Sequence, residues 1–354
     1  MSSPIAFTPQ RHARAARVCI GTMFCWTLAV QGLSAAEPTL VMLDRDPLLD
    51  RAIFQRMASH PDHHIRFAES GAASSNVDWE KNPDKPWYIE AQRYGGDLVE
   101  AGLLTNNPRL VDLGWTIIDW GFARQASDGG FGDTGDPFHS TSFFVEATAR
   151  ALLVARQLSA PDAEARAEHY GPKLAAAARW MREPRVIDRG LKNNRPYAHR
   201  RWLLAAAWGE AAGVLHDAAL DEAAEQQARD GLALQQGDGV NPEKDGFDVS
   251  YQAVGLLMAE RYLTVCNDAR LRASIRKMLS KGLDCELEKI DASGAIDSAG
   301  STRVNSETGR SGAAKTVDHK AIVFSLIYGA KLLNRPDCYV AAERVTRNLR
   351  WIKD

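Results

Sequence analysis

The sequence predicts an all-α fold, an (α/α)5–6 toroid built from repeated helix hairpins. Past residue 85, apolar helical runs alternate with loops broken by glycine and proline, and no stretch shows the sustained period-two alternation of strands. Similar runs recur at steps of roughly 50 to 70 residues, which suits one helix pair plus its loops. An open solenoid also stacks helix pairs. We favour the toroid because the loops are long and always precede the more apolar helix.

The more apolar runs are expected to form inner helices, and each begins just after a loop. Their polar entry residues are Tyr88, His139, Tyr197, Tyr251 and His319. The fourth of these helices is expected to begin at Ser250, a residue type that caps helix N-termini well. Segments with one polar face lie between the inner helices and are expected to form outer helices over 108–125, 161–181, 221–234 and 269–287.

Residues 1–36 have the three parts of an export signal. Arg11, Arg14 and Arg17 precede an apolar stretch over 18–33, and small residues end the segment. A membrane anchor is the alternative, but the apolar stretch is short for a bilayer span. The pattern therefore predicts a periplasmic or secreted protein.

Residues 37–354 are expected to form a single α/α-toroid catalytic domain, with 37–85 as an N-terminal extension packed on it. Taking the three arginines of the signal from 43 basic residues leaves 40, against 45 acidic residues. A mildly acidic chain disfavours bulk nucleic-acid binding, which needs a basic face. No later stretch is long and apolar enough to cross a bilayer, so no stable membrane insertion is expected.

Neither a metal nor a cofactor is expected. Three cysteines follow the signal, Cys266, Cys285 and Cys338. An odd number allows at most one intramolecular disulfide, and buried structural thiols are the favoured interpretation. A histidine cluster precedes the first helix, at His60, His63 and His64. A solvated loop is favoured over a metal site there, because no nearby carboxylate or cysteine completes a ligand set.

In a toroid, all the junctions between a loop and an inner helix point to one end. This end is expected to collect aromatic residues, amides and cations: Trp87, Tyr88, Gln92, Asp128, His139, Asn193, Asn194, Arg195, Tyr197, His199, Arg200, Asn241, Lys244, Tyr251, Arg303, Asn305, Arg310 and His319. Aromatic rings and amides suit sugars, while arginine and lysine suit carboxylates or sulfates. We therefore expect an acidic polysaccharide or oligosaccharide as the partner.

Two segments resemble those of alginate-lyase-like polysaccharide lyases, whose fold is an α/α toroid. Residues 192–199, KNNRPYAH, resemble the family's Asn-Asn-His-x-Tyr segment. Residues 237–262, GDGVNPEKDGFDVSYQAVGLLMAERY, resemble the segment in which a tyrosine opens an apolar helix. Order and spacing agree over about residues 190–262. Elsewhere only the architecture is similar.

The resemblance implies β-elimination of a uronic-acid-containing polysaccharide. Tyr251 would be the general acid/base, and Asn194 with Asn193 would bind the uronate carboxylate. Lys244 falls about where the family has a helper arginine. Arg195 replaces the family's histidine, so His199 or His139 would have to supply an imidazole. Further substrate-binding residues are expected at Arg195, Tyr197, Arg200, Tyr88, Arg303, Arg310 and His319.

Three other functions remain open. A glycoside hydrolase on the same scaffold, including one acting on unsaturated uronyl ends, needs two carboxyl groups across the scissile bond. Asp128, Asp133 or Asp136 could face Glu243 or Asp248 in this role. A non-catalytic carbohydrate-binding protein of the envelope would keep the aromatics and amides alone. A terpene-cyclase-like toroid is disfavoured, since the expected cleft is polar and has no aspartate-rich metal motif.

Overall fold

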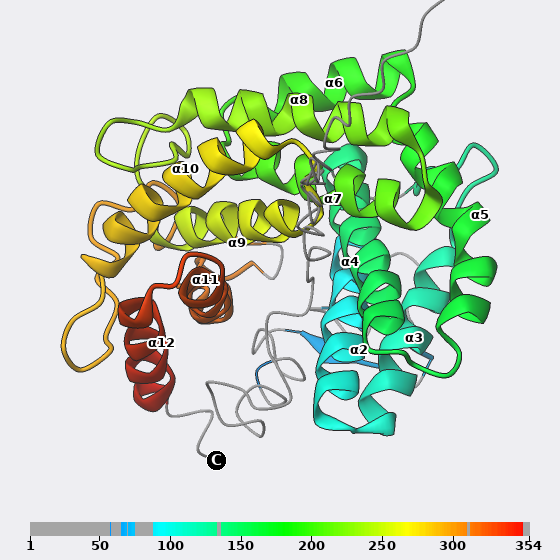
Figure 1. The fold of residues 1–354 in the computed structure, drawn as a ribbon, viewed down its shortest axis with the longest axis horizontal. Helices are drawn as coiled ribbons and strands as arrows, with labels where there is room; N and C mark the ends of the chain where they lie inside the picture. The colour runs from blue at the N-terminus through cyan, green and yellow to red at the C-terminus, as the bar shows by residue number, and fades with distance from the viewer. Residues whose placement is uncertain are drawn as a thin grey trace, which may run out of the picture. The chain divides into compact units, whose positions relative to one another are not determined.

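The computed structural model describes residues 57, 65–68, 70–74, 88–132, 136–309 and 312–349 (Figure 1), which all belong to one compact unit, 38–354. These residues are mainly helical. In chain order the elements are β1 (Arg66–Phe67), β2 (Ala73–Ser74), the 3-10 helix η2 (Ile89–Arg93), α2 (Tyr94–Thr105), α3 (Pro108–Phe122), α4 (Pro137–Gln157), α5 (Ala163–Met181), α6 (Pro184–Asn194), α7 (His199–Leu215), α8 (Ala218–Leu234), α9 (Val249–Val265), α10 (Ala269–Leu287), α11 (His319–Leu332) and α12 (Pro336–Asn348).

The helices form the hairpins of an α/α toroid. The inner helices α2, α4, α7, α9 and α11 pack side by side in chain order. Each is covered by the outer helix that follows it closely in sequence: α3, α5, α8, α10 and α12 (Figure 1). The ends of the series, α2 and α11, are joined by the ion pair between Asp97 and Lys320. The predicted fold class is thus confirmed, with five hairpins.

Burial separates the inner helices from the outer ones. In α4, 17 of 21 residues are buried, whereas in α5 only 7 of 19 are. Alanine- and leucine-rich sides allow an inner helix to pack all round, while an outer helix keeps a polar face in water. This difference in burial is the one that the apolar runs of the sequence predict.

Two loops that lead to inner helices contain the same turn. Before α4, Gly129 takes a φ of 94°, and the Asp128 carboxylate accepts the N–H of Gly130 at 2.9 Å. Before α9, Gly239 takes a φ of 95°, and the Asp238 carboxylate accepts the N–H of Val240 at 3.1 Å. A side chain at Gly239 would meet the Lys281 carbonyl oxygen, so a glycine is required there. The aspartate-glycine pairs of these loops therefore shape the backbone.

Two local expectations were wrong. Residues 184–194 form helix α6 where a loop was expected, and Pro184 stands in its first turn, where proline suits a helix. The N-cap of α9 is Asp248, whose carboxylate accepts the N–H groups of Ser250 and Tyr251 at 3.1 and 3.0 Å. The hydroxyl of Ser250 instead accepts the N–H of Asp318 at 2.8 Å and so ties α9 to the start of α11.

The described part of the N-terminal extension packs on the helices. The Gln92 side chain pairs with the N–H and C=O of Ala73, at 2.9 Å each, and Ala73 packs with Tyr94, Leu98 and Ile117. The three cysteines after the predicted signal are free thiols. None of the helices described in 57–349 is long and apolar enough to cross a membrane. The predicted signal lies outside the described residues.

Candidate active site

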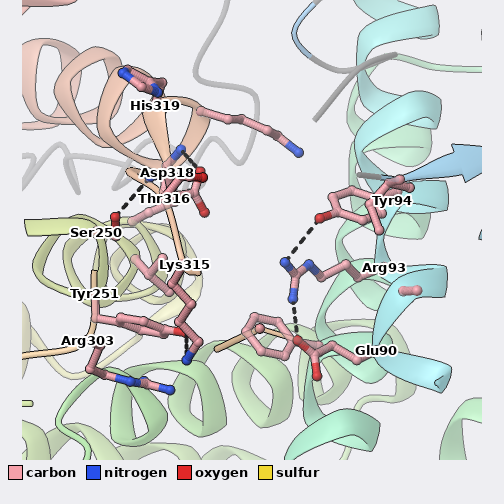
Figure 2. Close-up of a pocket in the computed structure, with 18 of the residues that line it drawn as sticks. Glu90, Arg93, Tyr94, Ser250, Tyr251, Arg303, Lys315, Thr316, Asp318 and His319 are labelled. Atoms are coloured by element: carbon pink, nitrogen blue, oxygen red, sulfur yellow. Dashed lines mark hydrogen bonds and ion pairs between the residues drawn. The ribbon is translucent and has the colours of Figure 1, made fainter. Parts of the chain in front are cut away.

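A cavity of about 890 Å³ lies between η2 and α2 on one side and α9, α11 and the loop over 301–318 on the other (Figure 2). Helices α4 and α7 also contribute residues to it, so every inner helix lines it. A cavity of this volume is in the range of small-molecule and oligosaccharide sites. The predicted convergence of distant segments is therefore observed.

Tyr251 lies in the first turn of α9 and lines this cavity. Asp248 caps the helix beneath it, and the second carboxylate oxygen of Asp248 accepts the N–H groups of Arg303 and Val304, both at 2.8 Å. One fully buried carboxylate thus positions both the tyrosine and the loop that faces it. Such double anchoring gives Tyr251 a well-defined place in the site.

Two cations contact Tyr251. The Lys315 ammonium donates a hydrogen bond to the phenol oxygen at 3.1 Å, and the Arg303 guanidinium lies over the ring, 3.6 Å from its centroid (Figure 2). Glu307 bonds to both cations, at 2.6 Å to Lys315 and 3.0 Å to Arg303. Positive charge is therefore held beside the phenol oxygen and over the ring of Tyr251.

His199 packs against Tyr251 from α7, with ring centroids 4.7 Å apart. Its Nδ1 lies 2.7 Å from a carboxylate oxygen of Glu243, and the same oxygen accepts the His199 backbone N–H at 2.9 Å. Burial lowers the pKa of His199, although the Glu243 carboxylate acts in the opposite direction. His199 is absent from the cavity lining, so it supports Tyr251 from behind, whereas His139 lines the cavity directly.

The opposite wall carries a second cationic group. Arg93 donates to Glu90 at 3.0 Å and to the Tyr94 hydroxyl at 3.3 Å, and it stacks on the Phe143 ring at 4.3 Å. Figure 2 shows this group facing Tyr251, Arg303 and Lys315 across the cavity. The two walls therefore present cations to the same space.

Deeper in the cavity is a charged cluster drawn from α2, α4, α9 and α11. Arg150 bonds to Asp97 at 2.9 Å and to Glu146 at 2.9 Å, and Arg261 bonds to Glu146 at 2.8 Å. Lys320 pairs with Asp97. Although burial alone would raise the pKa of Asp97, Lys320 and the two arginines hold it far below its ordinary value. Asp97 is thus held in its ionised form.

The balance of charge favours an anionic ligand. Eight arginine and lysine side chains line the cavity, against four aspartate and glutamate side chains. A concave surface with an excess of one sign attracts and orients ligands of the other sign. A neutral sugar would leave this excess uncompensated.

Six of the predicted site residues line the cavity: Tyr251, His139, Arg200, Tyr88, Arg303 and His319. Burial lowers the pKa of His319 and so favours its neutral imidazole. Tyr197 is not part of the lining, but its ring contacts the guanidinium groups of Arg200 and Arg303 at 4.4 and 4.9 Å. Arg310 and Trp87 lie outside the described residues.

The expected direct contact between the paired asparagines and substrate needs correction. Asn194 is buried and absent from the cavity lining, and its side-chain oxygen accepts a hydrogen bond from Arg200 at 3.1 Å. Asn193 and Arg195 are exposed at the end of α6 and do not reach the cavity. Because α6 continues through Asn194, the side-chain amide of Asn194 turns inward, whereas that of Asn193 stays exposed. Asn194 acts on the cavity through Arg200.

Lys244 also lies away from the cavity. It is exposed on the loop before α9, at a φ of 51°, and it pairs with Glu307. Lys315 takes the place beside Tyr251 that the resemblance assigned to Lys244. Other polar residues expected in the cleft are also absent from the lining: Gln92, Asp128, Asn241 and Asn305.

The carboxylates considered for hydrolysis have structural partners. Asp128 holds its turn, Asp136 caps α4 and pairs with Arg200 at 2.8 Å, and Asp248 caps α9. Glu243 is fully buried against His199. None of these four lines the cavity, and Asp133 lies outside the described residues.

Sequence reasoning missed Lys315, Glu307 and Arg93. Lys315 and Glu307 lie in the loop before α11. The periodicity of apolar residues does not indicate which loop residue contacts a helix, so the contact of Lys315 with Tyr251, 64 residues earlier, could not be predicted. Arg93 ends the short helix η2 and lies about one helical turn after Tyr88, the residue identified at this junction. Considering the cations one turn beyond each junction residue would have included Arg93.

Within the described parts of 57–349, no group of three histidine, cysteine, aspartate or glutamate side chains is arranged to hold a metal ion. The three clustered histidines of the extension fall outside those parts.

No family model matches the chain, and no curated protein matches it. Among solved structures, an inactive variant of the GH76 α-1,6-mannanase of Salegentibacter sp. HEL1_6 in complex with α-1,6-mannotriose has 10% identity and a TM-score of 0.43, over 84% of this chain and 100% of that chain. A GH76 α-mannanase of Bacteroides thetaiotaomicron has 7% identity and a TM-score of 0.46, over 86% of this chain and 85% of that chain. A variant of an unsaturated glucuronyl hydrolase, with dGlcA-Glc-Rha-Glc, has 15% identity and a TM-score of 0.40, over 75% and 74%.

All three are toroid glycosidases, and none of the three is a lyase. The expected likeness to alginate lyases is therefore supported only in the α/α toroid. At these identities and scores the likeness carries no conclusion about activity.

Proposed function

We propose that the chain is an exported polysaccharide lyase that cleaves an acidic, uronic-acid-containing polysaccharide or oligosaccharide by β-elimination. The observation that carries this proposal is the Tyr251 phenol oxygen, which faces a cavity with excess positive charge and accepts a hydrogen bond from Lys315 at 3.1 Å. A phenol held in this way can lose a proton and then act as a base on substrate.

The reaction requires two tasks of the protein. A base removes the C5 proton beside the uronate carboxylate, and positive charge stabilises the enolate-like transition state that follows. Tyr251 is the base, and Lys315 and Arg303 hold positive charge beside its oxygen and its ring. After proton removal, the electron pair at C5 forms the C4=C5 double bond, and the bond from C4 to the glycosidic oxygen breaks. Tyr251 then returns its proton to the departing oxygen.

Arg200 is assigned to the substrate carboxylate. It lines the cavity, and its position is set by Asp136 at 2.8 Å and by Asn194 at 3.1 Å. An arginine held from behind presents its remaining donors to a carboxylate at little cost in conformational entropy. In this assignment Asn194 contributes to carboxylate binding indirectly. His139 also lines the cavity and would supply a further polar contact to the substrate.

Hydrolysis is the second candidate, because it is the reaction of the solved structures described above. The four cavity carboxylates, however, are engaged: Glu90 by Arg93, Asp97 by Lys320, Glu146 by arginines, and Asp318 by the N–H of Ala321 at 2.9 Å. A general acid must be protonated at the working pH, and the cations beside Asp97 hold its carboxyl group in the ionised form. The geometry therefore favours elimination.

A panel of acidic polysaccharides, with neutral mannan as the control, tests both reactions. Elimination creates a C4=C5 double bond, which absorbs ultraviolet light, and it consumes no water. Hydrolysis creates reducing ends without this absorbance, and in water enriched in heavy oxygen it adds the label to the product. New absorbance without label supports the lyase. Label without absorbance replaces it with the hydrolase, and binding without either product would point to the non-catalytic carbohydrate-binding protein.

A further inference from the structure

The Glu307 carboxylate forms ion pairs with three cationic side chains, which come from two loops. Its carboxylate accepts from Lys315 at 2.6 Å and from Arg303 at 3.0 Å, and it also pairs with Lys244. Burial alone would raise the pKa of Glu307, but hydrogen bonds from Lys244, Lys315 and Arg303 lower it to about 2. The carboxylate is therefore ionised at every pH at which the protein would work.

Two of these three cations are the ones that contact Tyr251. Lys315 donates to the phenol oxygen, and Arg303 covers the ring. Glu307 itself is absent from the cavity lining, so it lies behind the cations. A carboxylate in this position holds both cations in place and also offsets part of their charge.

We propose that Glu307 is a positioning residue that sets the place and the effective charge of Lys315 and Arg303 against the Tyr251 oxygen. Its consequence for catalysis rests on the proposed function, whereas its consequence for the titration of Tyr251 does not. No direct contact of Glu307 with substrate is involved.

The charged groups around Tyr251 determine the sign of the effect. Lys315 and Arg303 approach from the loop before α11, and His199 approaches from α7 with Glu243 behind it. Across the cavity Arg93 faces them, paired with Glu90, and from α11 come His319 and Asp318 (Figure 2). Of these groups, Lys315 and Arg303 are the ones that bring positive charge into contact with the Tyr251 oxygen or ring. His199 also contacts the ring, but burial lowers its pKa and favours the neutral imidazole.

Replacing Glu307 by glutamine removes one negative charge while keeping a side chain of the same size. The uncompensated cations then stabilise negative charge on Tyr251 more strongly, so its titration moves to lower pH by about one unit. The acid limb of the pH profile of kcat/KM moves in the same direction. At the same time kcat falls about tenfold at the optimum, because Lys315 loses its strongest anchor.

The experiment compares Glu307→Gln, Glu307→Asp and a matched control, Glu225→Gln. Glu225 pairs with Arg229 at 2.8 Å on α8, its side chain is 28% exposed against 21% for Glu307, and it lies away from the cavity. Tyrosines labelled with carbon-13 are titrated by NMR in the purified chain, and the Tyr251 signal is assigned from Tyr251→Phe. The pH profile is measured in parallel on the substrate found by the panel.

The proposal expects both pH shifts in Glu307→Gln, partial recovery of kcat in Glu307→Asp, and neither effect in the control. If Glu307→Gln only lowers thermal stability, with the Tyr251 titration and the acid limb unmoved, the proposal is overturned. If the Tyr251 titration moves while no acidic sugar is cleaved by the parent protein, Glu307 retains its positioning role and the lyase function fails instead.

Discussion

Replacing Lys315 by methionine removes the positive charge closest to the Tyr251 oxygen and keeps most of the side chain's volume. Two unit charges at the observed 3.1 Å interact by about 5 kcal/mol at an effective dielectric constant of about 20. The Lys315 side chain is 21% exposed and shared with Glu307, so solvent and the carboxylate screen this value. A charged hydrogen bond measured by mutation contributes about 1.5 to 3 kcal/mol. We therefore expect kcat/KM to fall between about tenfold and about 150-fold.

Steady-state kinetics across a range of pH test this expectation. Because a cation that favours the phenolate is lost, the acid limb of kcat/KM should move to higher pH, opposite to its movement in Glu307→Gln. Lys289→Met is the matched control: Lys289 lies 3.8 Å from Asp297 and over the Phe247 ring, is 29% exposed, and is absent from the cavity. A Lys315→Met protein with activity within about twofold of the parent, and an unmoved acid limb, would refute the role of Lys315 at Tyr251.

Three further predictions follow from single contacts. Arg93→Ala should raise KM for acidic oligosaccharides by about tenfold with less change in kcat, because it removes a cation from the wall opposite Tyr251, and an unchanged KM would contradict this. Burial raises the pKa of Glu260 well above 4.5, so the unfolded chain releases this proton more readily than the folded one and stability falls as the pH rises above about 4.5. Glu260→Gln should therefore raise the denaturant midpoint at pH 7 and not at pH 4. Burial lowers the pKa of His199 from 6.5, so below about pH 6.5 the unfolded chain binds more protons than the folded one and the free energy of unfolding falls. His199→Gln should reduce this fall in the denaturant midpoint with decreasing pH.

The toroid could be predicted from sequence because burial follows composition. Helices such as α4 and α7 are rich in apolar residues and buried on nearly every side, and those such as α5 and α10 have one polar face. The boundaries of α10 were predicted correctly for the same reason. By contrast, α6 was missed, since its sequence is polar and ends in two asparagines that are also frequent in turns.

The candidate site could be predicted only in part. Tyr251 and His139 were placed correctly because each opens an apolar helix after a loop, a position that the toroid directs to one end. The same reasoning placed Lys244 in the cavity, although its backbone turns it outward towards Glu307. Lys315 was missed, since its contact with Tyr251 depends on how a long loop folds back on α9. Side-chain direction in loops is set by tertiary contacts that no periodic pattern records.

The most direct test of the central claim is the activity of Tyr251→Phe on an acidic polysaccharide that the parent protein cleaves. Phenylalanine keeps the ring that packs on Arg303 and His199, so the variant should fold and still bind the product oligosaccharide. We expect no increase in ultraviolet absorbance above the uncatalysed rate, because the group that removes and returns the proton is gone. Turnover by Tyr251→Phe at a rate close to that of the parent protein would contradict the account.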